Sequence, residues 1–259
     1  MGGVTNNSIL KCESLDLTFG RNNVLHDFSF AQDKNEIVGI IGPNGAGKSC
    51  ILNCINGFYH PQKGSIYLEG RDLTRLKSSK IAELGVARTF QEIELYSGMT
   101  VLDNLLAARH LKMRSNFLLE AFFFGPARRE EVRHREVVED IIDFLEMEPI
   151  RKRVVGSLPF GQRKKVELGR ALALDPKILL LDEPMAGMSV EEKEDMAKYF
   201  LDVFERMHVP ILIVEHDMEV IMDLADRIIV IDFGVKIAEG TPDEIKGNKK
   251  AIEAYLGAD

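Results

Sequence analysis

The sequence predicts an α/β fold with a mainly parallel sheet, an antiparallel β-subdomain in its amino-terminal part and an inserted helical subdomain. Three observations support this prediction. Short runs of β-branched residues and leucine are typical of strands that are buried on both faces. Stretches long enough to form crossover helices separate these runs, and such alternation indicates parallel pairing. One long stretch, residues 95–158, is rich in helix formers and contains no clear strand.

The first predicted elements are the strands of the amino-terminal sheet, Ile9–Phe19 and Ser65–Leu68. The strands of the parallel sheet are predicted at Ile37–Ile41 (IVGII), Ile178–Leu181 (ILLL) and Ile211–Val214 (ILIV). The helices between them are predicted at Lys48–Asn56, Glu191–Arg206 and Met218–Leu224. Sheets of this kind bind ligands beyond the carboxyl ends of their strands, so we expect function at that edge.

The helical insertion defines the predicted domain organisation. We expect a core at residues 1–94 and 159–241, the insertion at 95–158 and a carboxy-terminal helical appendage at 242–259, with a helix over Lys249–Leu256. Within the insertion, the mixed-charge run Arg128–Glu136 predicts a solvated helix face rather than a binding patch. The aromatic cluster Phe117–Phe124 (FLLEAFFF) has two interpretations, a packed subdomain core or a surface for a partner or membrane.

Composition narrows the classes of partner. The 259 residues contain 33 Lys and Arg against 41 Asp and Glu, and this net charge of −8 disfavours bulk attraction to nucleic acid or to an anionic membrane. No segment approaches the ~18 apolar residues of a membrane span, and residues 1–8 do not resemble a secretory signal, so we expect a cytosolic protein. The three cysteines, Cys12, Cys50 and Cys54, predict reduced thiols. Cys50 and Cys54 could share one helix face, but two ligands are too few for a structural zinc site.

The strongest functional motif is GPNGAGKS, which fits G-x-x-x-x-G-K-[ST] between the IVGII run and a predicted helix. In such a loop, glycines let backbone amides surround an anion, and the amino end of the helix adds partial positive charge. Lys48 would neutralise the β- and γ-phosphates of a nucleotide, and Ser49 would offer its hydroxyl to Mg²⁺. We predict a nucleotide site formed by Gly42, Pro43, Asn44, Gly45, Ala46, Gly47, Lys48, Ser49 and Cys50.

Two consecutive carboxylates end the ILLL run, in the sequence ILLLDEP. Burying two acids at the end of a strand is unfavourable unless a cation or a bound water uses them. We predict that Asp182 holds Mg²⁺, directly or through water. We also predict that Glu183 accepts a proton from the water that attacks the γ-phosphate.

These motifs, in this order, resemble the ATPase subunits of ATP-binding-cassette transporters over nearly the whole chain. The resemblance implies a P-loop NTPase core and roles for three further residues. Phe19, in LTFG, would stack against adenine. Gln91, in VARTFQE, would contact Mg²⁺ and the attacking water, and His216, in IVEHD, would contact the γ-phosphate. The turn at 187–189 corresponds to a family segment that crosses a dimer interface, although Ser189 stands where the family often has Asp.

The segment Leu158–Gln162 (LPFGQ) aligns with the family signature L-S-G-G-Q and departs from it at Pro159, which has neither a hydroxyl nor an amide hydrogen. The resemblance implies that Gly161 and Gln162 contact the γ-phosphate of ATP held by the opposite subunit. Because Pro159 removes one contact, we hypothesise slower hydrolysis or a weaker dimer at that composite site.

Further segments, among them NCINGFY, MTVLDNL and EGTPDEI, resemble the branched-chain amino-acid importer branch. The resemblance implies an ATPase that uses ATP with Mg²⁺, is cytoplasmic and lies on the inner face of the cell membrane. Its implied partners are two transmembrane permease subunits, a second ATPase subunit in a homo- or heterodimer and, indirectly, an extracytoplasmic solute-binding protein, with no nucleic acid. The alternatives are a transporter for urea, another amide or a lipid, and a soluble ATPase of translation or DNA repair.

Overall fold

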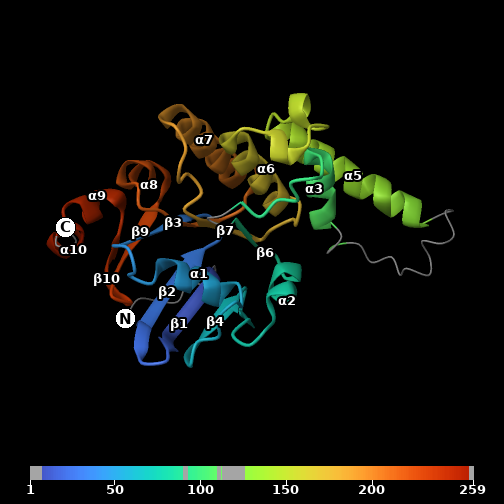
Figure 1. Ribbon diagram of the computed structural model, residues 1–259. Coiled ribbons are helices and arrows are strands. Elements are labelled where there is room, and N and C mark those ends of the chain that lie inside the picture. The colour runs from blue at the N-terminus through green and yellow to red at the C-terminus, as the bar shows by residue number, and fades with distance from the viewer. Residues whose placement is uncertain (1–7, 90–92, 110–111, 113–125, 257–259) are drawn as a thin grey trace.

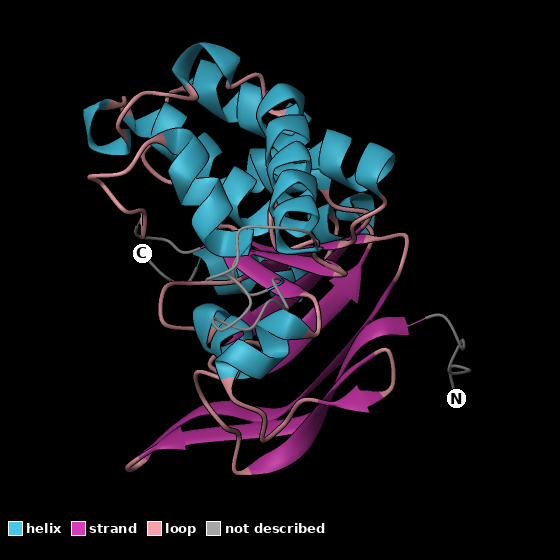
Figure 2. Ribbon diagram, turned by 90° about the vertical axis from the view of Figure 1, so that its right-hand side faces the viewer, coloured by secondary structure: helices cyan, strands magenta, loops and turns pink. Residues whose placement is uncertain are grey.

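The computed structural model describes residues 8–89, 93–109, 112 and 126–256. These residues form two β-sheets, one of four strands and one of six, with helices on both sides of the larger sheet (Figure 1). Viewed from the side, the large sheet separates a thick helical layer from a smaller layer made of short helices and the small sheet (Figure 2). The predicted α/β fold with two sheets is confirmed.

The small sheet is antiparallel and has the order β2-β1-β4-β5. Its strands are β1 (Ser8–Phe19), β2 (Asn22–Asp33), β4 (Lys63–Leu68) and β5 (Arg71–Asp72). Two of these strands match the sequence prediction, whereas β2 and β5 were not predicted. The alternation in β2 is irregular, because the register between β1 and β2 shifts at several points along the pair.

The large sheet has the order β10-β9-β3-β8-β7-β6, with β10 antiparallel at one edge and parallel pairing elsewhere. Its strands are β3 (Ile37–Ile41), β6 (Val86–Thr89), β7 (Ile178–Asp182), β8 (Ile211–Val214), β9 (Arg227–Asp232) and β10 (Val235–Gly240). Both faces are buried: Leu179 and Leu181 join one apolar core, whereas Ile178 and Leu180 join the other. This two-sided burial explains why the runs IVGII, ILLL and ILIV in β3, β7 and β8 contain no charged residue.

Most of the described helices lie in two groups about this sheet (Figure 1). On the side of the small sheet lie α1 (Lys48–Ile55) and α2 (Ser78–Glu83). The other layer holds α3 (Val101–Arg109), α5 (Pro126–Phe144), α6 (Phe160–Leu172) and α7 (Val190–Met207), with two 3₁₀ turns at Glu148–Ile150 and Val155–Ser157. The remaining helices are α8 (Met218–Leu224), α9 (Pro242–Lys246) and α10 (Lys249–Leu256).

Local signals set several helix starts. Ser189 begins α7 and Thr241 begins α9, each with a capping box whose third helical residue is a glutamate. The Asp217 carboxylate accepts from the Val220 amide and begins α8.

The residues of the predicted insertion that the structure describes are mainly helical, with one isolated β-bridge between Thr100 and Val154. The helix α6 packs closely on them, since a Cβ added at Gly169 would lie 3.3 Å from Leu105. Most described side chains of the charged run are exposed, as predicted, and His134 is the buried exception. The cluster Phe117–Phe124 lies outside the described residues.

Candidate functional site

The candidate site lies at one edge of the large sheet, where neighbouring parallel strands end. In the order β3-β8-β7-β6, the phosphate loop follows β3, His216 follows β8, and Asp182 and Glu183 lie at the end of β7. Gln91 follows β6 in the sequence but lies outside the described residues. The topology therefore brings together segments that are far apart in the chain, at the edge where parallel sheets bind ligands.

The phosphate loop is held closely against its neighbours. A Cβ at Gly42 would lie 2.0 Å from the backbone oxygen of Ile231, so only glycine fits there. Gly47 has a φ of 102° and leads directly into α1. The Gly234 amide, in the turn between β9 and β10, donates to the backbone oxygen of Ala46 at 2.9 Å. This support fixes the loop in front of the amino end of α1, which favours an anion.

Lys48 lies across the loop rather than in solvent. Its side-chain nitrogen donates to the backbone oxygens of Gly42 and Pro43 at 2.7 and 2.9 Å, and the residue is 6% exposed. Burial lowers the pKa of Lys48, and the carboxylates of Glu183 and Asp182 oppose that shift. The ammonium group is thus positioned where it can neutralise phosphate oxygens bound in the loop.

Asp182 is buried and held from two sides. Its Oδ1 accepts from the Ser49 hydroxyl at 3.2 Å, and its Oδ2 accepts from Nη2 of Arg88 at 2.7 Å. The Nη1 of Arg88 donates to the side chain of Asn53 in α1 at 2.7 Å. Arg88 therefore joins β6, β7 and α1, and it fixes the carboxylate so that one oxygen faces Ser49.

Glu183 and His216 face each other across the ends of β7 and β8. The Nδ1 atom of His216 lies 3.8 Å from Oε2 of Glu183 and 3.7 Å from Oε2 of Glu215. The His216 side chain is 54% exposed, whereas the side chains of Glu183 and Glu215 are 17% and 1% exposed. A half-exposed imidazole between two carboxylates can contact a ligand that enters from the solvent side.

The segment that carries His216 is fastened to α7. The Nζ atom of Lys193 donates to Oδ2 of Asp217 at 2.5 Å. This bond raises the pKa of Lys193 and lowers that of Asp217. The turn after β8 is consequently held on one side by the sheet and on the other by the first turns of α7.

Phe19 is placed at the end of β1 with its side chain 45% exposed, so it is not a core residue. Its ring meets the ring of Tyr59 edge to face, with the centroids 4.8 Å apart. This contact leaves part of the aromatic surface open, which suits stacking on a planar base. Cys50 lies in the first turn of α1, half-buried, directly after Ser49.

The signature residues lie at the start of α6, in the helical layer on the opposite side of the sheet from α1 (Figure 1). Pro159 is the N-cap of α6. A Cβ added at Gly161 would lie 2.3 Å from the carboxylate of Glu192 in α7. A Cβ added at Gly187 would lie 3.5 Å from the ring of Phe160. The signature segment is therefore packed against the turn 187–189 and α7.

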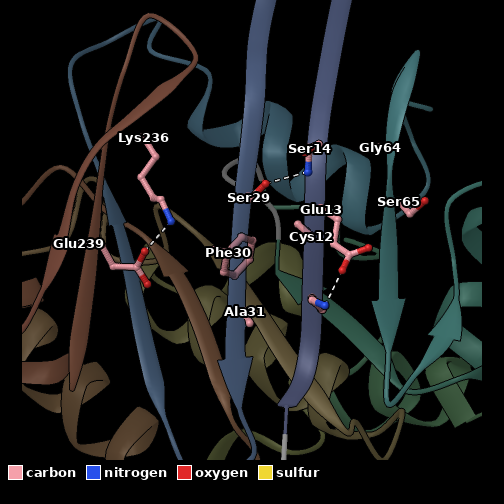
Figure 3. Close-up of a pocket in the computed structure, with 11 residues that line it drawn as sticks. Cys12, Glu13, Ser14, Ser29, Phe30, Ala31, Gly64, Ser65, Lys236 and Glu239 are labelled. Atoms are coloured by element: carbon pink, nitrogen blue, oxygen red, sulfur yellow. Dashed lines mark hydrogen bonds and ion pairs between the residues drawn. The ribbon is translucent and has the colours of Figure 1, made fainter. Parts of the chain in front are cut away.

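Several hollows in the surface of the described residues lie outside this cluster, among them one on the small sheet and one beside α2. The larger, of about 670 Å³, is a trough on the small sheet, flanked by Lys236 and Glu239 of β10 (Figure 3). These two side chains pair with each other, and the Ser14 amide donates to the Ser29 hydroxyl. A second groove, of about 260 Å³, lies between α2 and α6 and is bordered by exposed Phe58.

The described ranges contain no helix that is both long and apolar enough to cross a membrane. Nor do those ranges contain a group of three or more His, Cys, Asp or Glu side chains that could hold a metal ion by themselves.

Two residues of the site were not predicted, Arg88 and Glu215. Each is a charged residue at the end of an otherwise apolar strand, in VARTFQ and in IVEHD. This position of a charge is the one sequence feature that could have indicated that they belong to the site. Their contacts are not local, because Arg88 and Asp182 are 94 positions apart.

Comparison with known families gives two matches. A family model described as "ABC transporter" matches residues 25–186. A second model, described as "Branched-chain amino acid ATP-binding cassette transporter", matches residues 235–259. The first match includes the phosphate loop and both acids at the end of β7, and the second covers the carboxy-terminal end.

Individual relatives agree over nearly the full length. The chain is 36% identical to the high-affinity branched-chain amino acid transport ATP-binding protein BraF of Pseudomonas aeruginosa, covering 96% of this chain and 98% of BraF. It is 35% identical to LivG of Escherichia coli, a protein with the same description, with the same coverage. Among solved structures, the ADP conformation of MJ1267, an ATP-binding cassette of an ABC transporter, matches with a TM-score of 0.84 and 32% identity, covering 96% of this chain and 99% of that one.

Proposed function

This chain belongs to the ABC transporter family, and from this membership we propose that it is the ATP-hydrolysing subunit of an importer for branched-chain amino acids. The observation that carries the proposal is the convergence of the phosphate loop, Asp182, Glu183 and His216 at one edge of the sheet. The cargo is supported by the relatives named for branched-chain amino acid transport and by the family match over residues 235–259.

The oxygen donors beside the loop fit Mg²⁺, which binds proteins through few carboxylates and completes its shell with water and substrate phosphates. The Ser49 hydroxyl and the Asp182 carboxylate, 3.2 Å apart, would hold it together with ATP, and Gln91 is proposed as a further ligand from its motif. When bound, Mg²⁺ supplies positive charge that offsets the charge on the phosphates.

The protein's side chains account for the chemical step. Glu183 accepts a proton from a water molecule as the water oxygen bonds to the γ-phosphorus and the bond to the β–γ bridging oxygen breaks. Lys48 and His216 stabilise the negative charge on the phosphoryl oxygens, and the loop amides bind the remaining phosphates. Phe19 provides a surface for adenine.

We propose that a second ATPase subunit contacts the ATP held in the phosphate loop, through the segment of that subunit that corresponds to Gly161 and Gln162. Both residues lie in α6, in the helical layer on the opposite side of the sheet from α1, and this placement supports the arrangement. ATP that contacts both subunits favours the closed dimer, and hydrolysis removes those contacts. Because Pro159 offers no hydroxyl or amide hydrogen, we propose a weaker dimer at that composite site.

The permease subunits would dock at the groove between α2 and α6. This groove lies between the sheet core and the helical layer, and Phe58, 63% exposed, projects at its border. An exposed aromatic side chain beside a groove whose lining is more apolar than polar is typical of a protein contact surface. Docking there would hold the chain on the inner face of the cell membrane, in the cytoplasm.

Reconstitution of the chain with its membrane subunits and solute-binding protein in vesicles tests the proposed function. Leucine, isoleucine or valine is expected to increase ATP turnover several-fold over the solute-free rate and to accumulate inside the vesicles. Stimulation by urea, a short amide or a lipid, with no response to the three amino acids, would overturn the cargo. Turnover that is unchanged by the membrane subunits would overturn the role as a transporter subunit.

A further inference from the structure

Glu215 is a buried carboxylate that the proposed chemical step does not use. It follows β8 directly and is 1% exposed. Its Oε1 accepts from the Met185 amide at 3.2 Å, and its Oε2 accepts from the His216 amide at 3.1 Å. Met185 lies in the turn that begins at Glu183. The two oxygens of one side chain therefore bind two different turns, one beside the proposed base and the other at the proposed phosphate contact.

The surroundings of Glu215 favour this double contact. Burial raises the pKa of Glu215, while the amides of Met185 and His216 and the His216 ring oppose that shift. Desolvating a carboxylate is unfavourable unless hydrogen bonds compensate, and here both oxygens have a backbone donor. A neutral apolar side chain could fill the same space, but it would leave both amides without these acceptors.

The His216 ring lies between the two carboxylates. Its Nδ1 is 3.7 Å from Oε2 of Glu215 and 3.8 Å from Oε2 of Glu183. Because Glu215 also binds the His216 backbone, a change at Glu215 alters both the position of the turn and the charge beside the ring.

We propose that Glu215 is a positioning residue for ATP hydrolysis, which sets the position of His216 relative to Glu183 by holding both turns with one carboxylate. It acts through His216 and does not contact the nucleotide. The proposal rests on the roles proposed above for Glu183 and His216. It predicts that losing one acceptor of Glu215 impairs the chemical step more than the binding of ATP.

The variant Glu215→Gln keeps the size of the side chain, but its single amide oxygen can serve only one of the two backbone donors. We expect kcat for ATP hydrolysis to fall about tenfold or more, while KM and the affinity for a fluorescent ATP analogue change less than about twofold. The matched control is Glu36→Gln. Glu36 precedes β3 at the opposite edge of the sheet, and its Oε2 also accepts a backbone amide, that of Asp33, at 3.1 Å. This control should retain wild-type kcat.

A double-mutant cycle separates positioning from general stability. If Glu215 acts through His216, the change Glu215→Gln should lower kcat much less in a His216→Ala background than in the wild type. Equal, additive losses in both backgrounds, or a Glu215→Gln variant with wild-type kcat, would overturn the proposal. If Glu215→Gln does not fold, Glu215→Asp keeps the charge but shortens the reach. It should also lose kcat, and wild-type kcat in that variant would overturn the proposal as well.

The same set of variants distinguishes this proposal from the proposed function. Wild-type turnover in both Glu183→Gln and His216→Ala would remove the roles on which the proposal rests, and the proposal with them. Loss of turnover in those two variants, with normal turnover in Glu215→Gln, would overturn the positioning role alone.

Discussion

At the residue scale, Glu183 is the least ordinary position in the site. Its φ of 46° lies in the left-handed region, which costs roughly 1 kcal/mol for a residue with a Cβ. Its amide donates to the Val214 oxygen of β8 at 2.9 Å, so the sheet pairing extends through the bend. Backbone strain of this kind is concentrated at functional sites. The bend turns the chain away from the strand directly after Asp182, and the Glu183 carboxylate then lies near His216.

Labelling of the cysteine thiols tests whether nucleotide binds beside Cys50, at the end of the phosphate loop. Cys12 and Cys54 are buried and Cys50 is half-buried, so we expect a thiol reagent to modify Cys50 first in the folded protein. Burial and the nearby Asp182 raise the pKa of Cys50 above 9.0, and because the thiolate is the reactive form, the labelling rate should still increase above pH 9.

The measurement is the time course of labelling with and without ATP and Mg²⁺. Bound nucleotide should slow it severalfold, since Cys50 directly follows Ser49. The variant Cys50→Ser should lose the fast phase. Simultaneous modification of all three cysteines, or labelling that ATP does not slow, would contradict this placement.

At the scale of elements, Arg88 connects β6, β7 and α1. The variant Arg88→Met leaves the buried carboxylate of Asp182 without its cation, so we expect the free energy of unfolding to fall by about 3–5 kcal/mol. The double variant Arg88→Met, Asp182→Asn should recover part of that loss, because the uncompensated charge is gone. Urea unfolding followed by circular dichroism measures both. A double variant that is as unstable as the sum of both single changes would show that charge compensation is not the cause.

The ion pair between Lys193 of α7 and Asp217, just before α8, predicts how the stability of the protein depends on pH. Lys193 lowers the pKa of Asp217, and the two side chains are 29% and 26% exposed, so the pair should contribute about 0.2–1 kcal/mol. A depressed pKa in the folded state means that this contribution is present above the unfolded value of 3.8 and is lost as the pH falls through the folded value.

Urea unfolding of Lys193→Met at pH 7 and near pH 3 checks this expectation. The variant should be less stable than the wild type at pH 7, and the difference should shrink at the lower pH. The control is Lys198→Met on the same helix, whose pair with Asp195 is 71% and 70% exposed and should contribute nothing measurable. A Lys193 difference that stays constant with pH would exclude the ion pair as its source.

At the scale of the whole molecule, the buried strands could be predicted because β3, β7 and β8 lie between two apolar cores and carry no charged residue except Asp182 at the end of β7. Local patterns could not predict β2, where register shifts interrupt the alternation. The phosphate loop and the DEP sequence could be identified because each is a contiguous motif. Contacts such as Arg88 with Asp182 depend on the strand order β7-β6, which one sequence without relatives does not specify.

The fold places the phosphate loop, two acids and a histidine at one edge of the sheet. The central claim is that this site hydrolyses ATP with Glu183 as the general base. A single-turnover assay on the wild type and on Glu183→Gln tests this claim most directly. ATP binding is measured in parallel, and Lys48→Ala serves as a variant that should bind ATP poorly. We predict that Glu183→Gln binds ATP with Mg²⁺ as tightly as the wild type and hydrolyses it at least about 100-fold more slowly. Equal rates of hydrolysis in the two proteins would contradict it.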